Sequence, residues 1–296
     1  MGNARCTGTD RERRPLCSES LSSGARYLVR NPTGSDGGFV LFVHGLGSTA
    51  AAWNPVACHA PGRTGLLVPD LPGFGRSPTG GRVPPLEAAT DMIVELLQRY
   101  MEQARVTVVA HSVGAIVAMR ALHRVDSNRL HRFVLVAGTL VSASHVLASA
   151  QAATADPKLT AMVGIHALAG AIPLDTRGAR AIARHRTLRA ALLWPFLAHP
   201  QQVPEPDLLA VLPHSGGSES VRAIWSARDV DVRALMAHTE VATRIVCGDR
   251  DRLIHVGDVN TARSLLNPDE VVVLEGCGHW PHIERPAQTA AAVFES

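Results

Sequence analysis

Lysine is almost missing from this sequence of 296 residues, because Lys158 is the only one and every other basic side chain apart from histidine is arginine. The formal net charge is only +3, and the charges are scattered along the chain instead of forming a stripe. Proteins that bind nucleic acids present clustered positive charge to the phosphates. The sequence therefore predicts no nucleic-acid partner.

Long hydrophobic runs are also missing. A helix that crosses a bilayer needs about 20 mostly apolar residues, whereas the longest apolar runs here are only long enough for a strand. We therefore expect no membrane insertion. Residues 1–20 are polar and rich in arginine, without the apolar segment of a secretory signal. We expect residues 1–24 to be a disordered N-terminal extension.

Cysteine is scarce, with five in the whole chain. The cysteines are widely spaced and form no CxxC pair, so neither a disulfide framework nor a zinc site is predicted. The spacing of His279 and His282 is His-x-x-His, but it does not complete a zinc pattern either. This cysteine usage fits a reducing cytoplasm, and we expect a cytoplasmic protein.

Short apolar runs alternate with helical segments over most of the chain. Several runs, such as FVLFV and VTVVA, are apolar at consecutive positions and rich in valine, as strands buried on both faces should be. The alternation predicts an α/β protein with a mostly parallel central sheet flanked by helices. Strands are expected at residues 25–30, 39–43, 65–68, 106–110, 133–137, 244–247 and 271–274, and helices at 86–102, 113–123, 259–266 and 286–294.

The alternation of strand-like and helical segments stops between residues 138 and 241. This stretch is rich in alanine and has few strand-like runs, and helices are expected at 141–153, 159–169 and 177–193. We interpret it as a helical insertion before the sheet resumes near residue 244. The predicted core then consists of residues 25–138 and 242–296, and the predicted insertion of residues 139–241.

The segment VTVVAHSVGAIVAM indicates a nucleophilic serine. A buried strand leads directly into Ser112, and a helix follows it. Small residues two positions before and after the serine allow the sharp turn of a G-x-S-x-G elbow, which projects the hydroxyl from the carboxyl edge of the sheet. Ala110 replaces the first glycine of that pattern. A serine at the start of a helix could also be a simple N-cap.

A second strand, FVLFV, ends in the small-residue turn His44-Gly45-Leu46. Acyl transfer to a serine places negative charge on the carbonyl oxygen of the substrate, and backbone N–H groups can stabilise that charge. We expect the N–H groups of Leu46 and Val113 to form this oxyanion hole. The alternative is that the turn is merely a tight loop.

The base and the acid are expected near the C-terminus, after the nucleophile in chain order. One strand is followed by Gly248, Asp249 and Asp251, and the next strand by His279, which is flanked by a glycine. We predict Ser112 as nucleophile, His279 as general base and Asp251 as the acid that orients the base. Asp249 is expected to cap the turn.

At this point the chain resembles the α/β-hydrolase superfamily, in its lidded branch of esterases, carbon–carbon bond hydrolases and lactonases. The resemblance runs from about residue 25 to the C-terminus. It rests on five motifs in the right order: FVHGLGSTAAAW, VPDLPGFGRS, AHSVGA, CGDRD and EGCGHWPHIERP. Relatives that open epoxides or remove halides carry an aspartate at the elbow, so Ser112 argues against those reactions.

The resemblance also implies roles for the remaining parts of the chain. Residues 139–241 would be a lid over the active site, and Asp70 and Arg76 would belong to a loop that mainly shapes the site, so we expect both to be structural. Five aromatic residues are candidates for the substrate pocket, although each could equally be a packing residue: Trp53, Trp194, Phe196, Trp225 and Trp280.

The resulting hypothesis is a serine hydrolase for a small, largely apolar carboxylic ester, thioester or lactone, acting through an acyl-enzyme without cofactor or metal. Two alternatives stay open. The same fold and triad could serve a lyase, a cyclase or a cofactor-free oxygenase, or the chain could be a ligand-binding receptor without turnover. The sequence does not decide the natural substrate or whether the chain forms a homodimer.

Overall fold

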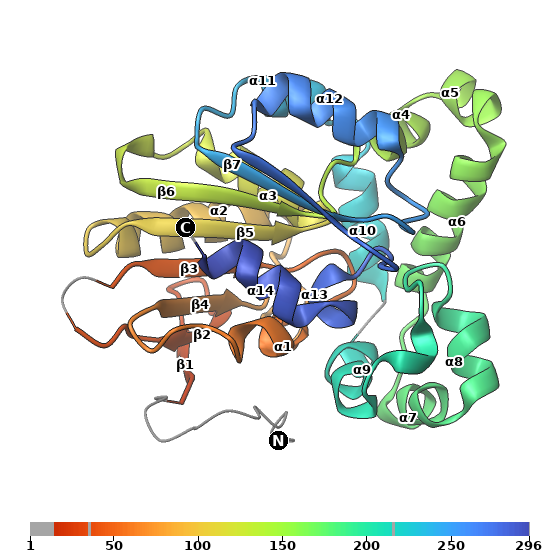
Figure 1. Ribbon diagram of the computed structural model, residues 1–296, viewed down its shortest axis with the longest axis horizontal. Helices are drawn as coiled ribbons and strands as arrows, with labels where there is room; N and C mark the ends of the chain where they lie inside the picture. The colour runs from red at the N-terminus through yellow and green to blue at the C-terminus, as the bar shows by residue number, and fades with distance from the viewer. Residues whose placement is uncertain (1–14, 35–36, 215–216, 296) are drawn as a thin grey trace.

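The computed structural model describes residues 15–34, 37–214 and 217–295, and these contain one eight-stranded sheet (Figure 1). The strand order is β1-β2-β4-β3-β5-β6-β7-β8. The strands are β1 (Cys17–Ser20), β2 (Arg26–Arg30), β3 (Phe39–Val43), β4 (Gly65–Pro69), β5 (Val106–His111), β6 (Leu130–Val136), β7 (Thr243–Gly248) and β8 (Glu270–Leu274). All seven strands expected from the sequence are present, and the predicted fold class is confirmed.

The sheet is parallel from β4 to β8, while β1 and β2 form an antiparallel edge. Because parallel strands share a direction, the carboxyl ends of β3, β5, β6, β7 and β8 open at the same edge of the sheet. Every residue of β3 and β5 is buried. These two central strands are therefore covered on both faces, as their continuous apolar sequences predict.

Helices cover the two faces of the sheet. The side chains of β3 alternate between two clusters: Phe39, Leu41 and Val43 face one layer, and Val40 and Phe42 face the other. The first layer is built from α2 (Pro85–Met101), α3 (Val113–Leu122), α11 (Val232–Ala237) and α12 (Val256–Leu266), and the second from α1 (Asn54–Ala57), α13 (Pro281–Glu284) and α14 (Pro286–Phe294). In Figure 1, α13 and α14 lie in front of the sheet and α2 and α3 behind it.

Between β6 and β7 the described residues form helices and no strand. The helices before α11 are α4 (Val141–Ala148), α5 (Ala150–Ala155), α6 (Pro157–Ala171), α7 (Thr176–Arg184), α8 (Arg186–Leu193), α9 (Glu205–Val211) and α10 (Ser218–Ala227). Helices α7, α8 and α9 form a small hydrophobic cluster that also includes Ala52 and Ile283 of the core. Figure 1 shows α6 to α10 gathered beside the carboxyl edge of the sheet. We call residues 139–241 the helical insert.

The expected N-terminal extension needs a correction. Residues 17–20 form β1, which pairs antiparallel with β2, so this part of the predicted 1–24 extension is ordered strand. The sequence CSES is polar and mostly exposed, because β1 lies at the edge of the sheet and buries little. Residues 1–14 lie outside the described residues.

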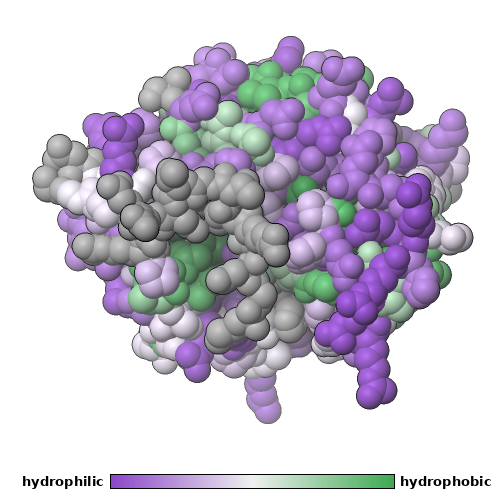
Figure 2. Space-filling model, turned by 60° about the horizontal axis from the view of Figure 1, so that its bottom comes forward, coloured by the Kyte–Doolittle hydropathy of each residue, from purple (hydrophilic) through white to green (hydrophobic). Residues whose placement is uncertain are grey.

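The surface is mostly hydrophilic on the face that Figure 2 presents. There the described hydrophobic residues form small, separate patches among hydrophilic ones. Within the described parts of the chain, no helix combines the length and apolar character needed to span a membrane.

Candidate active site

Ser112 lies at the sharp turn between β5 and α3, at the centre of the carboxyl edge. Its backbone has φ 51° and ψ −127°, a conformation that residues other than glycine rarely adopt. The Ser112 N–H donates to the carbonyl of Val136 on the neighbouring strand β6 (3.1 Å), which holds the turn in place. This strained backbone conformation directs the Ser112 hydroxyl away from the sheet, as the elbow motif predicts.

Gly114 permits this turn because α3 starts very close to β3. A Cβ atom at Gly114 would lie 2.4 Å from the His44 carbonyl oxygen and 2.9 Å from that of Val43. Ala110, which replaces the first glycine of the elbow pattern, is fully buried in β5. The departure from the pattern is therefore accommodated within the strand.

His279 reaches Ser112 from the loop after β8. Its Nε2 lies 2.9 Å from the Ser112 Oγ, and its Nδ1 lies 2.8 Å from the Asp251 Oδ2. The His279 N–H donates to the Phe196 carbonyl of the helical insert (2.7 Å), so the insert fixes the backbone of this loop. The structure thus brings together the three residues that the sequence predicts as a triad.

Asp251 is held in a single orientation in the loop after β7. Its second oxygen, Oδ1, accepts the N–H groups of Leu253 (2.8 Å) and Ile254 (3.1 Å). Burial alone would raise the pKa of Asp251, but the nearby His279 ring and the hydrogen bonds outweigh burial and lower it. Asp251 is therefore an ionised acceptor near neutral pH.

The other acid of this loop does not contact His279. The Asp249 Oδ1 accepts the Cys277 N–H (3.2 Å), and its carboxylate faces Arg250 at 3.7 Å. It ties the loop after β7 to the loop after β8, in keeping with the turn-stabilising role expected from the sequence.

Leu46 and Val113, the residues expected to form the oxyanion hole, both line the pocket beside Ser112. Neither backbone N–H donates a hydrogen bond to any described residue. Val113 is the first residue of α3, so its N–H has no acceptor within the helix. Two backbone donors are thus available next to the serine.

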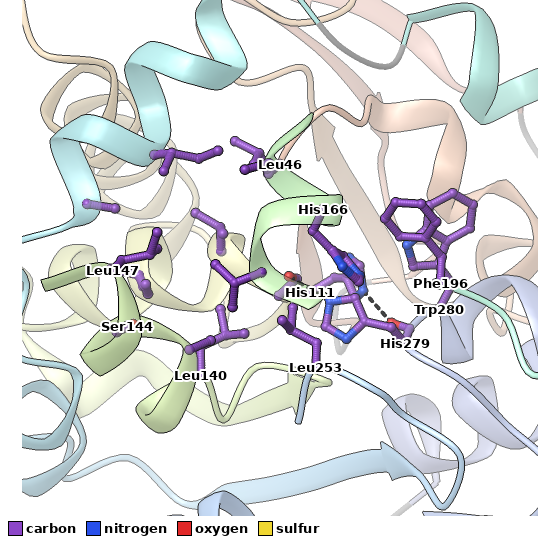
Figure 3. Close-up of a pocket in the computed structure, with 18 residues that line it drawn as sticks. Leu46, His111, Leu140, Ser144, Leu147, His166, Phe196, Leu253, His279 and Trp280 are labelled. Atoms are coloured by element: carbon purple, nitrogen blue, oxygen red, sulfur yellow. Dashed lines mark hydrogen bonds between the residues drawn. The ribbon is translucent and has the colours of Figure 1, made fainter. Parts of the chain in front are cut away.

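Two buried histidines, His44 and His111, brace the loops around the serine. The His44 Nδ1 donates to the Gly45 carbonyl (2.8 Å), and its Nε2 accepts the Leu71 N–H (2.9 Å). The His111 Nε2 donates to the His279 carbonyl (2.8 Å), drawn as a dashed line in Figure 3. Both were missed by sequence reasoning, although each stands directly at the end of a strand that carries a site motif.

Burial keeps these rings neutral. It lowers the pKa of His44, although the Gly45 carbonyl and Asp70 act in the opposite direction. Burial, followed by the nearby His282 and His279, lowers the pKa of His111 well below its ordinary value. A neutral His111 can donate to the His279 carbonyl without adding a charge beside the His279 ring.

The loop carrying Asp70 and Arg76 has the structural role expected of it. The two carboxylate oxygens of Asp70 accept the backbone N–H groups of Ala50 (2.8 Å) and Arg76 (3.0 Å). These bonds tie the loop to the turn that follows β3. Among the described residues, no group of three histidine, cysteine or acidic side chains is placed to hold a metal ion.

The serine opens into an apolar pocket of about 830 Å³ of empty space, part of it open to solvent. Its wall is formed by leucine, isoleucine, valine and alanine side chains from the core and from α4, α6 and α10 of the insert. Figure 3 shows Leu140, Leu147 and Leu253 on one side of His279, and Phe196 and Trp280 on the other. Binding sites for small molecules have this largely apolar character.

Two of the five aromatic residues expected in the pocket, Phe196 and Trp280, line it with ring centroids 5.1 Å apart. The other three need correction. Trp53 is fully buried in the core, packed between Phe42 and His282.

Trp194 and Trp225 are exposed at the surface of the insert, at 41% and 60% respectively. Each packs against an arginine, with the Arg252 guanidinium 5.1 Å and the Arg228 guanidinium 4.4 Å from the ring centroid.

A further polar side chain in the pocket had no sequence signal. His166 lies on α6 and faces His279, with the two ring centroids 5.6 Å apart and the planes perpendicular. It stands on a helix of the insert outside every motif, so only the packing of the insert onto the core reveals it.

Comparison with known proteins agrees with this geometry. The family model described as the alpha/beta hydrolase family matches residues 40–292. The chain belongs to the alpha/beta hydrolase family. The match spans both parts of the sheet and the helical insert between them, and the mostly parallel sheet flanked by helices is the fold of this family.

Individual relatives of this alpha/beta hydrolase are distant. An uncharacterised protein of Mycobacterium tuberculosis is 24% identical over 259 residues, which cover 84% of this chain and 72% of that protein. A solved structure of E-2-(acetamidomethylene)succinate hydrolase superposes with a TM-score of 0.69 at 17% identity, covering 94% of this chain and 98% of that one.

A meta-cleavage product hydrolase superposes with a TM-score of 0.67 at 19% identity, covering 96% of this chain and 97% of that one. Identities this low establish a common fold and leave the substrate open. Family membership supports a hydrolase, and the substrate class has to be argued from the site.

Proposed function

We propose that this alpha/beta hydrolase is a serine hydrolase that cleaves a small, largely apolar carboxylic ester, thioester or lactone through an acyl-enzyme. The observation that carries the proposal is the hydrogen-bonded chain from Asp251 through His279 to Ser112, which ends in an apolar pocket. No metal or other cofactor takes part in the proposed reaction.

The proposed reaction starts with proton transfer. His279 takes the Ser112 proton on Nε2 as Oγ attacks the substrate carbonyl, while Asp251 holds Nδ1–H and stabilises the imidazolium. The oxygen of the tetrahedral intermediate accepts the N–H groups of Leu46 and Val113. His279 then gives the proton to the leaving atom of the substrate, which departs. In the second step His279 removes a proton from water, the water oxygen attacks the acyl-enzyme, and His279 returns the proton to the Ser112 Oγ.

The pocket supports an apolar acyl group. Its wall near Leu140, Leu147 and Val163 has no charged side chain among the described residues, so a carboxylate there would lose its hydration without a partner. Phe196 and Trp280 provide a flat aromatic contact on the other side of His279. We assign residues 139–241 the role of a lid, because α4, α6, α10 and Phe196 supply much of the pocket wall.

A fluorophosphonate probe tests the nucleophile. It should label the folded protein at Ser112, and labelling should vanish in Ser112→Ala, because this hydroxyl is paired with a histidine that Asp251 orients. Peptide mapping locates the label. A label on Ser48 or Ser77, or no label on folded protein, would show that the proposed site is wrong.

A panel of acyl esters, thioesters and lactones then tests the reaction. We expect hydrolysis of short apolar acyl substrates by the wild type and none by Ser112→Ala. A protein that is labelled at Ser112 but hydrolyses no member of the panel would contradict hydrolysis and favour a non-hydrolytic use of the triad. Saturable ligand binding with negligible turnover would favour a receptor.

A further inference from the structure

His166 lines the pocket and carries a defined acceptor atom. Its Nδ1 lies 2.9 Å from the Met162 carbonyl oxygen, one turn earlier on α6. A carbonyl oxygen can only accept, so Nδ1 carries the proton and donates it. Burial, followed by the nearby His279, lowers the pKa of His166 to about 4, so the ring is neutral at pH 7. In a neutral ring with Nδ1 protonated, Nε2 is a hydrogen-bond acceptor.

This acceptor is buried and unmatched. The Nε2 of His166 has no hydrogen-bond partner among the described residues. The ring packs against Phe196, with centroids 4.4 Å apart, and stands at right angles to His279. Burying an acceptor without a hydrogen-bond donor costs free energy, and an apolar side chain at this position would avoid that cost. The position therefore calls for a donor that arrives with the substrate.

The neighbouring base indicates which part of the substrate brings this donor. In the proposed reaction, His279 gives its proton to the leaving atom, so the leaving group lies against the His279 ring. His166 stands beside that ring, whereas Leu140 and Leu253 lie on its far side (Figure 3). The acyl chain then occupies the leucine side, and the leaving group extends toward His166.

We propose that His166 is a specificity residue whose Nε2 accepts a hydrogen bond from a hydroxyl or N–H group on the leaving group. This inference rests on the proposed function. It defines the substrate class more narrowly as an apolar acid esterified to an alcohol that carries a second donor, such as a diol, a polyol or an amido alcohol. The donor lies a few bonds beyond the ester oxygen.

A pair of matched esters tests the proposal. Hydroxyethyl butanoate and propyl butanoate share the acid and differ only in an OH group in place of a methyl group at the end of the alcohol. One hydrogen bond to a buried acceptor changes a binding or specificity constant by about tenfold. The kcat/KM of the wild type should therefore be about tenfold higher for the hydroxyethyl ester than for the propyl ester.

The variant His166→Phe should lose this preference selectively. It keeps a ring against Phe196 but has no acceptor, so the ratio of the two kcat/KM values should fall to about one, whatever the change in the absolute rates. Val163→Ala, on the same helix and in the same pocket, is the matched control. It alters packing and leaves the acceptor in place, so the ratio should stay near the wild-type value.

Several results would overturn the assignment. The first is a wild type that hydrolyses both esters equally well, which needs no variant to observe. The second is a hydroxyl preference that persists in His166→Phe, and the third is a preference for a hydroxyl on the acyl chain only. Fluorophosphonate labelling of Ser112 distinguishes a wrong assignment of His166 from failure of the proposed function. A protein that is neither labelled nor active on either ester refutes both proposals.

Discussion

Replacing Asp251 by asparagine is the sharpest test of how the acid works, because the structure fixes the orientation of the new side chain. The Oδ1 of Asp251 accepts two backbone N–H groups, from Leu253 and Ile254. An amide nitrogen at that position would face two donors, so the asparagine oxygen must stay there. The NH₂ group then takes the place of Oδ2 and faces the His279 Nδ1, 2.8 Å away.

The consequence is the wrong tautomer of His279. An NH₂ group only donates, so Nδ1 must accept, and the ring proton moves to Nε2, where it points at Ser112. His279 can then no longer remove the serine proton. By analogy with other triads we expect kcat to fall by up to about 10⁴, equivalent to about 5.5 kcal/mol of activation free energy.

The measurement is kcat on a chromogenic ester, together with the rate of fluorophosphonate labelling and the melting temperature. Asp249→Asn is the matched control, because Asp249 lies in the same loop and accepts one backbone N–H at 3.2 Å without touching His279. It should lose much less activity. If Asp249→Asn lost more activity than Asp251→Asn at equal stability, the acid would have to be reassigned.

Three further predictions concern residues around the triad. Cys277→Ser should keep kcat within about tenfold of wild type, because burial raises the pKa of the Cys277 thiol and keeps it protonated; loss on the scale of Ser112→Ala in folded protein would contradict this. Gly114→Ala should lower the free energy of unfolding by about 1–3 kcal/mol, since its Cβ would overlap the His44 carbonyl; an unchanged urea midpoint would refute that clash. Burial lowers the pKa of His282 to about 3 in the folded protein. Below about pH 6.5 the unfolded chain therefore binds a proton that the folded protein does not bind, and the free energy of unfolding decreases as the pH falls. His282→Phe should therefore lose about 2 kcal/mol less than wild type between pH 7 and pH 5; equal losses in urea titrations would argue against a neutral His282.

The central strands could be predicted from the sequence because they are buried on both faces. FVLFV at residues 39–43 matches β3 residue for residue, and Val106 begins β5 as expected. Helix α14 also has the predicted bounds, because its opening proline marks the first turn. The polar strand β1 could not be predicted, since its four residues are held by pairing with β2 and carry no hydrophobic pattern.

The proximity of Ser112, Asp251 and His279 could be predicted for a related reason: each of them follows a strand with a strong apolar signal, and parallel strands bring their carboxyl ends together. The pocket could not. Trp53 and Trp280 look alike in sequence, but one packs in the core against Phe42 and the other faces the pocket. The tertiary packing decides such differences, and the place of His166 in particular depends on how α6 lies over His279.

The backbone of Ser112 has a consequence for engineering. A residue with a side chain at φ 51° and ψ −127° carries about 1–3 kcal/mol of conformational strain, which glycine would largely avoid. Fold stability and chemistry therefore make opposite demands on this one position. A laboratory selection for heat resistance alone would accept glycine at residue 112 as an improvement and would discard the nucleophile, so any such selection needs to score turnover as well.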